Sequence, residues 1–253
     1  MLLRTASSQE PQTRNEPPFG EFVALVALMM GLTSFAIDNL LPAFDVLRAA
    51  FAVADPNHAQ LTVYVYMIAF ALGQFVYGPV SDMIGRRPAL LAGLVIFAAG
   101  CVLAIAATSF SLLLAARAIQ GVGSAAARVL AVTIVRDRFV GRDMARVMSL
   151  TMMVFLIVPI FAPAIGSLLL ALGGWRTIFA ATLGLGVLLA AWFGWRMPET
   201  LHPEHRFPFS LAQVVKALRL TVTTRVSIGY ATGVGLMMGC LMAYIGSAQQ
   251  ILE

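Results

Sequence analysis

The sequence predicts an all-α integral membrane protein, on the basis of its composition and the length of its apolar segments. Of the 253 residues, 60% are hydrophobic and 11% are charged, and the mean hydropathy is +0.87. A soluble domain of this size could not bury so much apolar surface. The apolar residues also gather into separate runs, each about as long as the roughly 20 residues that a transmembrane helix needs.

Seven such runs define the predicted helices and the domain organisation. They cover approximately residues 22–47, 61–80, 89–107, 110–135, 147–172, 177–195 and 226–252. The polar residues 1–18 lack an apolar signal-peptide core, so we expect a flexible cytoplasmic tail there. We expect residues 19–196 to form a six-helix bundle, residues 197–225 a cytoplasmic linker, and residues 226–253 the first helix of an incomplete second bundle.

The distribution of lysine and arginine predicts the orientation in the membrane. With a cytoplasmic N-terminus, thirteen of the 17 basic residues fall in inside segments, two in outside loops (Arg48 and Arg176) and two within the fourth run. The positive-inside rule therefore predicts a multi-pass protein with its N-terminus in the cytoplasm. The basic residues lie in short separate loops rather than in one stripe, so the sequence pI of 9.8 does not indicate nucleic-acid binding.

No group of residues indicates an enzyme or a metal site. Cys101 and Cys240 lie inside apolar runs, where cysteine acts as a small packing residue. The three histidines lie in predicted loops, and no run holds a serine–histidine pair, paired aspartates or a His-Glu-x-x-His motif. The sequence therefore predicts no catalytic residue, no cofactor and no metal.

Ionisable residues inside the runs are the first candidates for function, since each costs about 2.5 to 3.5 kcal/mol at the bilayer centre. At 1.5 Å per helical residue, Asp38 lies about 14 Å and Arg117 about 10 Å below the outer boundary. At similar depth, the two could contact each other or face one aqueous chamber. We predict that Asp38 binds and releases a proton or a cationic group, and that Arg117 tunes its affinity or binds an anionic group. The alternatives are a static ion pair, or an Asp38 solvated near the outer surface.

The fourth run carries one polar face. Arg117, Gly121, Ser124 and Arg128 recur at intervals of four, three and four residues, and Gln120 lies beside them. This is the spacing of one side of an α-helix. Polar groups avoid hydrocarbon, so this face is expected to look into protein or water. Arg128 lies near the cytoplasmic end, where its side chain is expected to reach the lipid phosphates or the aqueous surface.

A short polar segment, Gly-Pro-Val-Ser-Asp-Met-Ile-Gly-Arg-Arg at residues 78–87, separates the second run from the third. A link this short is rigid, and Gly78 and Gly85 are expected to remove side chains where two helix ends crowd together. Arg86 and Arg87 are expected to hold the link on one side of the membrane.

The fifth run combines prolines with small residues. Pro159 and Pro163 each remove a backbone N–H and are expected to bend the helix. Ala162, Gly166 and Ser167 are expected to form a small-residue face for close helix packing. A proline-kinked packing helix of ordinary kind would explain the same residues.

Several of these segments resemble motifs of one transporter family. Residues 78–87 read like the signature G-x-x-x-D-(R/x)-x-G-R-R/K between the second and third helices of major facilitator superfamily transporters. Residues 114–123 resemble the R-x-x-Q-G-x-G signature in the fourth helix of proton-coupled facilitators. Residues 36–43 and 174–179 resemble the A-I-D-x-x-L-P-A and G-W-R-x-I-F patterns of the bicyclomycin-resistance (Bcr/CflA) type of drug:proton antiporter. Residues 159–167 match the antiporter signature G-x-x-x-G-P-x-x-G-G in part, since alanine and serine replace two of its glycines.

The resemblance implies a fold and roles for particular residues. Such transporters have about twelve helices in two halves, each made of two inverted three-helix repeats, with substrate bound between the halves. The chain is then the N-terminal six-helix bundle plus a seventh transmembrane helix. The implied roles are proton or substrate coupling for Asp38, Arg117 and Gln120, a cytoplasmic gating loop with a charge-relay lock for Gly78, Asp82, Gly85, Arg86 and Arg87, and the helix-packing and antiporter motif for Gly121, Pro159, Pro163 and Gly166.

We therefore expect a secondary-active transporter of a bacterial-type cytoplasmic membrane that exports drugs or small amphiphilic metabolites in exchange for protons. Its expected partners are a small-molecule substrate, protons and the lipid bilayer. The chain ends at Glu253 after the seventh run, so we expect a fragment whose C-terminal half is missing. The alternatives are an importer or facilitator with the same fold, or a nonfunctional half-transporter.

Overall fold

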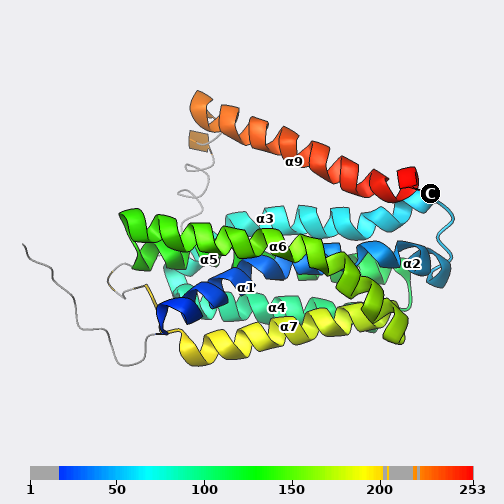
Figure 1. Cartoon of the computed structure of the whole chain (residues 1–253), viewed down its shortest axis with the longest axis horizontal. Coiled ribbons are helices and arrows are strands. Elements are labelled where there is room, and N and C mark those ends of the chain that lie inside the picture. Colours follow the sequence, from blue (N-terminus) through cyan, green and yellow to red (C-terminus); the bar gives the residue numbers. More distant parts are fainter. Residues whose placement is uncertain (1–16, 202–203, 205–218, 221–222, 253) are drawn as a thin grey trace, which may run out of the picture. The chain divides into compact units, whose positions relative to one another are not determined.

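A computed structural model shows that residues 19–196 form long helices joined by short links, and that a further long helix follows from Arg225 (Figure 1). The structure describes residues 17–201, 204, 219–220 and 223–252, and no β-strand occurs among them. The long helices are α1 (Phe19–Asp38), α3 (Leu61–Ile84), α4 (Arg86–Ile105), α5 (Phe110–Arg138), α6 (Gly141–Gly173), α7 (Trp175–Arg196) and α9 (Arg225–Leu252). Short helical segments link α1 to α3: η1 (Leu41–Ala43), α2 (Phe44–Ala50) and η2 (Pro56–Gln60).

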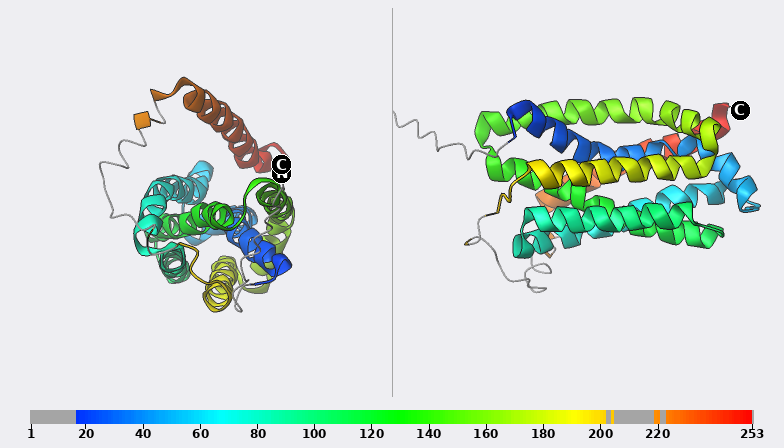
Figure 2. Two further views of the ribbon diagram at one scale, coloured as in Figure 1. Left: turned by 90° about the vertical axis from the view of Figure 1, so that its left-hand side faces the viewer. Right: turned by 90° about the horizontal axis from the view of Figure 1, so that it is seen from below.

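The chain divides into two compact units, residues 1–206 and residues 207–253. In the first unit, six helical segments are long and apolar enough to cross a membrane, and they run side by side in Figure 2. In the second unit, the seventh apolar run forms the helix α9. The prediction of an all-α membrane fold is confirmed. Most of the predicted tail and most of the predicted linker lie outside the described residues, and the domain boundaries at residues 19, 197 and 226 stay predictions.

Helix α5 is the packing centre of the first unit. It lies along both α3 and α4, while α1 lies along α6 and α4 along α7. Small residues allow these close approaches, because a Cβ at Gly121 would overlap the carbonyl oxygen of Tyr66 on α3. On the opposite side, a Cβ at Gly123 would overlap the backbone nitrogen of Phe97 on α4. Glycines at helix interfaces are a common way for membrane helices to pack without large side chains.

Single glycines make two of the sharpest turns. Gly85 alone separates α3 from α4 with a φ of 107°, and Gly174 alone separates α6 from α7 with a φ of 77°. Such positive φ angles are strained for residues that carry a Cβ. The link at Gly85 is shorter than predicted, since α3 continues to Ile84 and includes most of residues 78–87.

The first run, residues 22–47, was predicted as one membrane span, and the segment Phe19–Ala50 is long and apolar enough for one. It is not α-helical throughout. Helix α1 ends at Asp38, and the chain then passes through a turn, η1 and α2. Pro42 explains the break. A proline has no N–H to bond the carbonyl four residues earlier, and its ring clashes with that carbonyl, which here belongs to Asp38.

Candidate functional site

The polar face of α5 lies inside the bundle, and Arg117 is its centre. The side chain of Arg117 is 0% exposed. Its Nε donates to the carbonyl oxygen of Thr62 on α3 at 2.9 Å, and its Nη1 donates to the carbonyl oxygen of Ala36 on α1 at 3.1 Å. Nη1 also donates to Oε1 of Gln120 at 2.6 Å. One guanidinium therefore ties together three helices through neutral oxygen acceptors.

Aromatic and polar neighbours complete this core. The guanidinium carbon of Arg117 lies 4.3 Å from the ring centre of Tyr66 and 5.9 Å from that of Phe179, which are distances of cation–π attraction. The Tyr66 hydroxyl donates to Oγ of Ser124 at 2.8 Å, and Nε2 of Gln120 lies 3.0 Å from Sγ of Cys101. Nη2 of Arg117 is buried without a hydrogen-bond partner among the described residues.

Asp38 is the last residue of α1, and it is partly exposed. Its carboxylate forms no ion pair or side-chain hydrogen bond with any described residue. A static Asp38–Arg117 ion pair is therefore absent from the described contacts. The connection between the two is indirect, because Arg117 bonds the carbonyl of Ala36, two residues before Asp38 on the same helix end.

One detail of the predicted chamber needs correction. Arg117 has no exposed surface, so it does not share an aqueous chamber with Asp38 in this conformation. The predicted depth of Asp38 below the outer boundary stays a prediction.

Asn39 anchors the end of α1, and the sequence reasoning missed it. Its side chain is buried, and Nδ2 donates to Oγ1 of Thr182 on α7 at 3.0 Å. A Cβ at Gly166 on α6 would overlap the carbonyl oxygen of Asn39, so α6 approaches the same point closely. Together with Arg117, these contacts hold the residues around Asp38 from α5, α6 and α7. Pro42 was the available signal, because it predicts a helix end there.

Arg128 lies ten residues before the end of α5, about 15 Å along the helix, and its side chain is partly exposed. Its guanidinium carbon lies 4.9 Å from the ring centre of Phe155 on α6, and Nη1 is buried without a partner among the described residues. The guanidinium therefore packs on an aromatic ring, and its predicted reach to the lipid phosphates or the aqueous surface stays a prediction.

The two glycines of residues 78–87, Gly78 and Gly85, have different surroundings in the structure. Gly78 lies inside α3, and a Cβ there would meet nothing within 4 Å, so the expected crowding at Gly78 is wrong. The reason is that α3 continues past it, and the turn occurs at Gly85. There the glycine provides a positive φ angle, which residues with a Cβ rarely adopt.

Arg86 is the centre of an ion-pair network. Its guanidinium bonds the carboxylate of Asp82, and its Nε donates to Oδ2 of Asp137 on α5 at 3.0 Å. Nη1 also donates to Oγ of Ser81 at 2.7 Å. The network therefore joins the end of α3, the start of α4 and the end of α5.

Glu199, just after α7, caps the start of α4. Its carboxylate oxygens accept from the backbone N–H groups of Arg86 at 2.8 Å and Arg87 at 3.2 Å. A carboxylate suits this place because helix N-termini carry unpaired N–H groups and partial positive charge. The Arg87 side chain bonds the carbonyl oxygen of Gly194 and no described carboxylate.

Asp137 and Glu199 were not predicted as site residues. Each is an acid at the end of an apolar helix, in the segments Arg136-Asp137-Arg138 and Pro198-Glu199-Thr200. The neighbouring basic residues and proline do not predict which distant residue each carboxylate bonds. The partner of Asp137 lies 51 residues away, and that of Glu199 lies 113 residues away.

Helix α6 contains Pro159 and Pro163 and runs without interruption for 33 residues. Ala162 and Gly166 are buried, as a packing face requires. Ser167 is exposed, and its Oγ donates to the carbonyl oxygen of Pro163 at 3.1 Å. The expectation that Ser167 belongs to the packing face was therefore wrong.

The comparisons with known proteins identify the family. The model of the Major Facilitator Superfamily matches residues 23–252, so the chain belongs to this family of membrane transporters. Together with the apolar helices, this makes it a multi-pass membrane protein.

Its relatives include drug-resistance proteins. The chain is 33% identical over 242 residues to the uncharacterized MFS-type transporter YdgK of Bacillus subtilis, covering 93% of this chain and 60% of that protein. It is 29% identical to a bicyclomycin resistance protein homolog of Haemophilus influenzae, covering 88% of this chain and 56% of that protein. It is 37% identical to multidrug resistance protein D of Escherichia coli, covering 70% and 44%. The chain thus spans about half the length of these relatives.

Solved structures support the fold alone. The human organic anion transporter MFSD10 matches with a TM-score of 0.62 at 21% identity, covering 79% of this chain and 53% of that one. A D-xylose-proton symporter matches with a TM-score of 0.59 at 18% identity, covering 86% and 56%.

Proposed function

We propose that the complete protein exports drugs or small amphiphilic molecules from the cytoplasm in exchange for protons. It acts in the bacterial cytoplasmic membrane with its N-terminus inside, as the positive-inside rule predicts. Its second half completes the substrate pathway. The resistance named in two of its relatives and the partial antiporter pattern at residues 159–167 support export.

The observation that carries the proposal is the contrast between Asp38 and Arg117. Asp38 is an ionisable group in a membrane segment, partly exposed and without a described charged partner. Intramembrane carboxyl groups in this situation serve as sites for protons or cationic substrates in many transporters. Arg117 is a positive charge held by neutral oxygens, one of which is the carbonyl of Ala36, two residues before Asp38 on α1.

In the proposed cycle, Asp38 takes up a proton from outside and releases it inside. Protonation removes the negative charge at the end of α1 and so changes its attraction to Arg117, which is strong in a low-dielectric interior. Arg117, Asn39 and Gly166 connect that helix end to α5, α7 and α6. The charge change is thereby passed to the helices that must move against the second half.

The membrane potential supplies enough energy for useful export. One elementary charge crossing 100 mV yields about 2.3 kcal/mol. Since about 1.4 kcal/mol corresponds to a tenfold ratio, one proton supports a substrate gradient of tens of fold.

The test is proton-driven transport in everted membrane vesicles that contain the complete protein. We expect Asp38→Asn to lower the substrate accumulation driven by a proton gradient at least tenfold relative to the unsubstituted protein. The matched control is Asp45→Asn on α2, whose carboxylate is exposed and paired with Arg48. Proton-driven accumulation that survives Asp38→Asn would reject the proposed role of Asp38. Substrate movement down its gradient without protons would favour a facilitator.

A further inference from the structure

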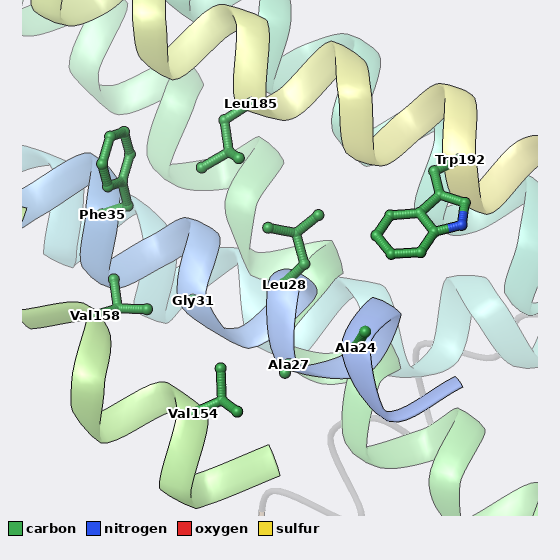
Figure 3. A pocket seen from close by; sticks show the side chains of 9 residues that line it. All are labelled: Ala24, Ala27, Leu28, Gly31, Phe35, Val154, Val158, Leu185 and Trp192. Atoms are coloured by element: carbon green, nitrogen blue, oxygen red, sulfur yellow. The ribbon is translucent and has the colours of Figure 1, made fainter. Parts of the chain in front are cut away.

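A pocket of about 310 Å³ lies between α1, α6 and α7 (Figure 3). Nine residues line it, and each is apolar or, at Gly31, has no side chain. Trp192 lies at one end of the pocket and Phe35 at the other. The only polar group among these side chains, the indole N–H of Trp192, already donates to Oε1 of Glu21 at 3.0 Å. The pocket therefore offers a ligand hydrophobic contact and no hydrogen bond from its lining side chains.

The shape of the pocket fits a hydrocarbon chain. It extends along α1 from Ala24 to Phe35, eleven residues or about 16 Å. That length equals one leaflet of a bilayer whose hydrocarbon core is about 30 Å thick. A volume of about 310 Å³ spread over this length is a narrow groove, which suits a single chain of carbons. A helix, about 10 Å in diameter, is too wide to fill it.

A charged group lies beyond the Trp192 end. Arg196, one helical turn after Trp192, donates two hydrogen bonds of 2.6 Å to the carboxylate of Glu21. Its Nη1 has no hydrogen-bond partner among the described residues, and its side chain is 37% exposed. Trp195 beside it is 87% exposed, as is typical of an aromatic residue at a membrane interface. An exposed arginine N–H at this place suits a phosphate group.

We propose that this pocket binds one acyl chain of a phospholipid, from the leaflet at the end of the bundle where α1 begins, with the lipid phosphate at Arg196. The apolar lining excludes a polar ligand, since nothing in it could replace the hydrogen bonds lost to water. The length of one leaflet and the cation at one end favour a lipid that stays in its own leaflet. The site is independent of the transport function proposed above.

The test uses Trp192 as the reporter. In the complete protein in which every tryptophan except Trp192 is replaced by phenylalanine, Trp175 and Trp195 included, the fluorescence of Trp192 is followed in detergent while phosphatidylglycerol with two bromine atoms midway along one acyl chain is added. Bromine quenches tryptophan only at contact. We expect quenching that saturates near one lipid per protein. In the matched protein that keeps only Trp195, we expect gradual quenching without saturation.

Two variants locate the bound chain. Ala24→Phe places a ring at the pocket from an exposed position on α1, and we expect the lipid concentration for half-quenching to rise at least threefold. Ala191→Phe is the control, because Ala191 is exposed on α7 and does not line the pocket. If Ala24→Phe does not fold, Val154→Phe on α6 serves the same purpose. Quenching of Trp192 that matches that of Trp195, or an unchanged half-quenching concentration, overturns the proposal. Displacement of the lipid by a transported drug would assign the pocket to the transport route instead.

Discussion

The two ends of α5 hold arginine charges in different ways. Near its start, Arg117 is fully buried and is bonded by neutral carbonyl and amide oxygens. Near its end, Asp137 belongs to a network in which Arg86 bonds two carboxylates, with 23% of the Asp137 side chain and 50% of the Asp82 side chain exposed. About twenty residues, or roughly 30 Å of helix, separate the two sites.

The difference bears on which site we propose responds to a proton. The network at Arg86 is already charge-paired and partly in contact with solvent, so salt and water weaken any further change. The charge of Arg117 has no described carboxylate beside it, and its side chain is fully buried. A change of charge at Asp38 therefore acts on a guanidinium that solvent does not reach. We infer that the first site couples to protons, and that the second joins helix ends.

Removal of Arg117 should have the largest effect. Arg117→Met deletes three hydrogen bonds from a charged donor and leaves their acceptors without this partner, so the free energy of unfolding should fall by at least about 3 kcal/mol. Arg128→Met is the control, since it removes one cation–π contact worth about 0.5 to 2 kcal/mol. Denaturant unfolding of the purified complete protein measures both. Equal losses would contradict the central position of Arg117.

Two glycines test how tightly α3 packs, since Gly121 faces α3 at a crowded contact and Gly78 lies at an open position on α3. Gly121→Ala should destabilise the protein by about 1 to 3 kcal/mol, because the new Cβ overlaps the Tyr66 carbonyl and pushes α3 from α5. Gly78→Ala should be neutral or stabilise by up to about 1 kcal/mol, since that helical position is open. Thermal unfolding of the two variants distinguishes them. The opposite order would show that α3 and α5 pack differently.

Substitutions in the network at Arg86 should lower the free energy of unfolding by smaller amounts, and by less where the carboxylate is more exposed. Asp137→Asn should lower the free energy of unfolding by about 1 to 2 kcal/mol, and Asp82→Asn by less than about 1 kcal/mol, since its carboxylate is more exposed. Both losses should shrink as salt rises from 0.05 to about 0.5 M, because the ions screen partly exposed pairs. Unfolding in two salt concentrations checks this. Losses that do not change with salt would argue against an electrostatic origin.

Much of the fold could be predicted from the sequence, and the reason is physical. A bilayer demands long apolar runs, and these runs became the helices. Hydropathy does not register where the backbone breaks, however. The run that contains Asp38 and Pro42 is apolar enough for its hydropathy to predict one continuous helix. The missing N–H of Pro42 explains why α1 ends at Asp38.

The candidate site could be predicted in part. Helical spacing alone brought Arg117, Gln120 and Ser124 onto one face, because the period of a helix is fixed. The acceptors of Arg117 are backbone carbonyls of α1 and α3, which no side-chain pattern reveals. Asp137, Glu199 and Asn39 were missed for a related reason, since their partners depend on the packing of helices distant in sequence.

The most direct test of the account is the release of protons when substrate binds. The purified complete protein is mixed with a transported drug in weakly buffered solution that contains a pH indicator. If Asp38 carries the exchanged proton, the unsubstituted protein and the Asp45→Asn variant should each release protons, and Asp38→Asn should release none. Release from Asp38→Asn equal to that of the unsubstituted protein would contradict the account.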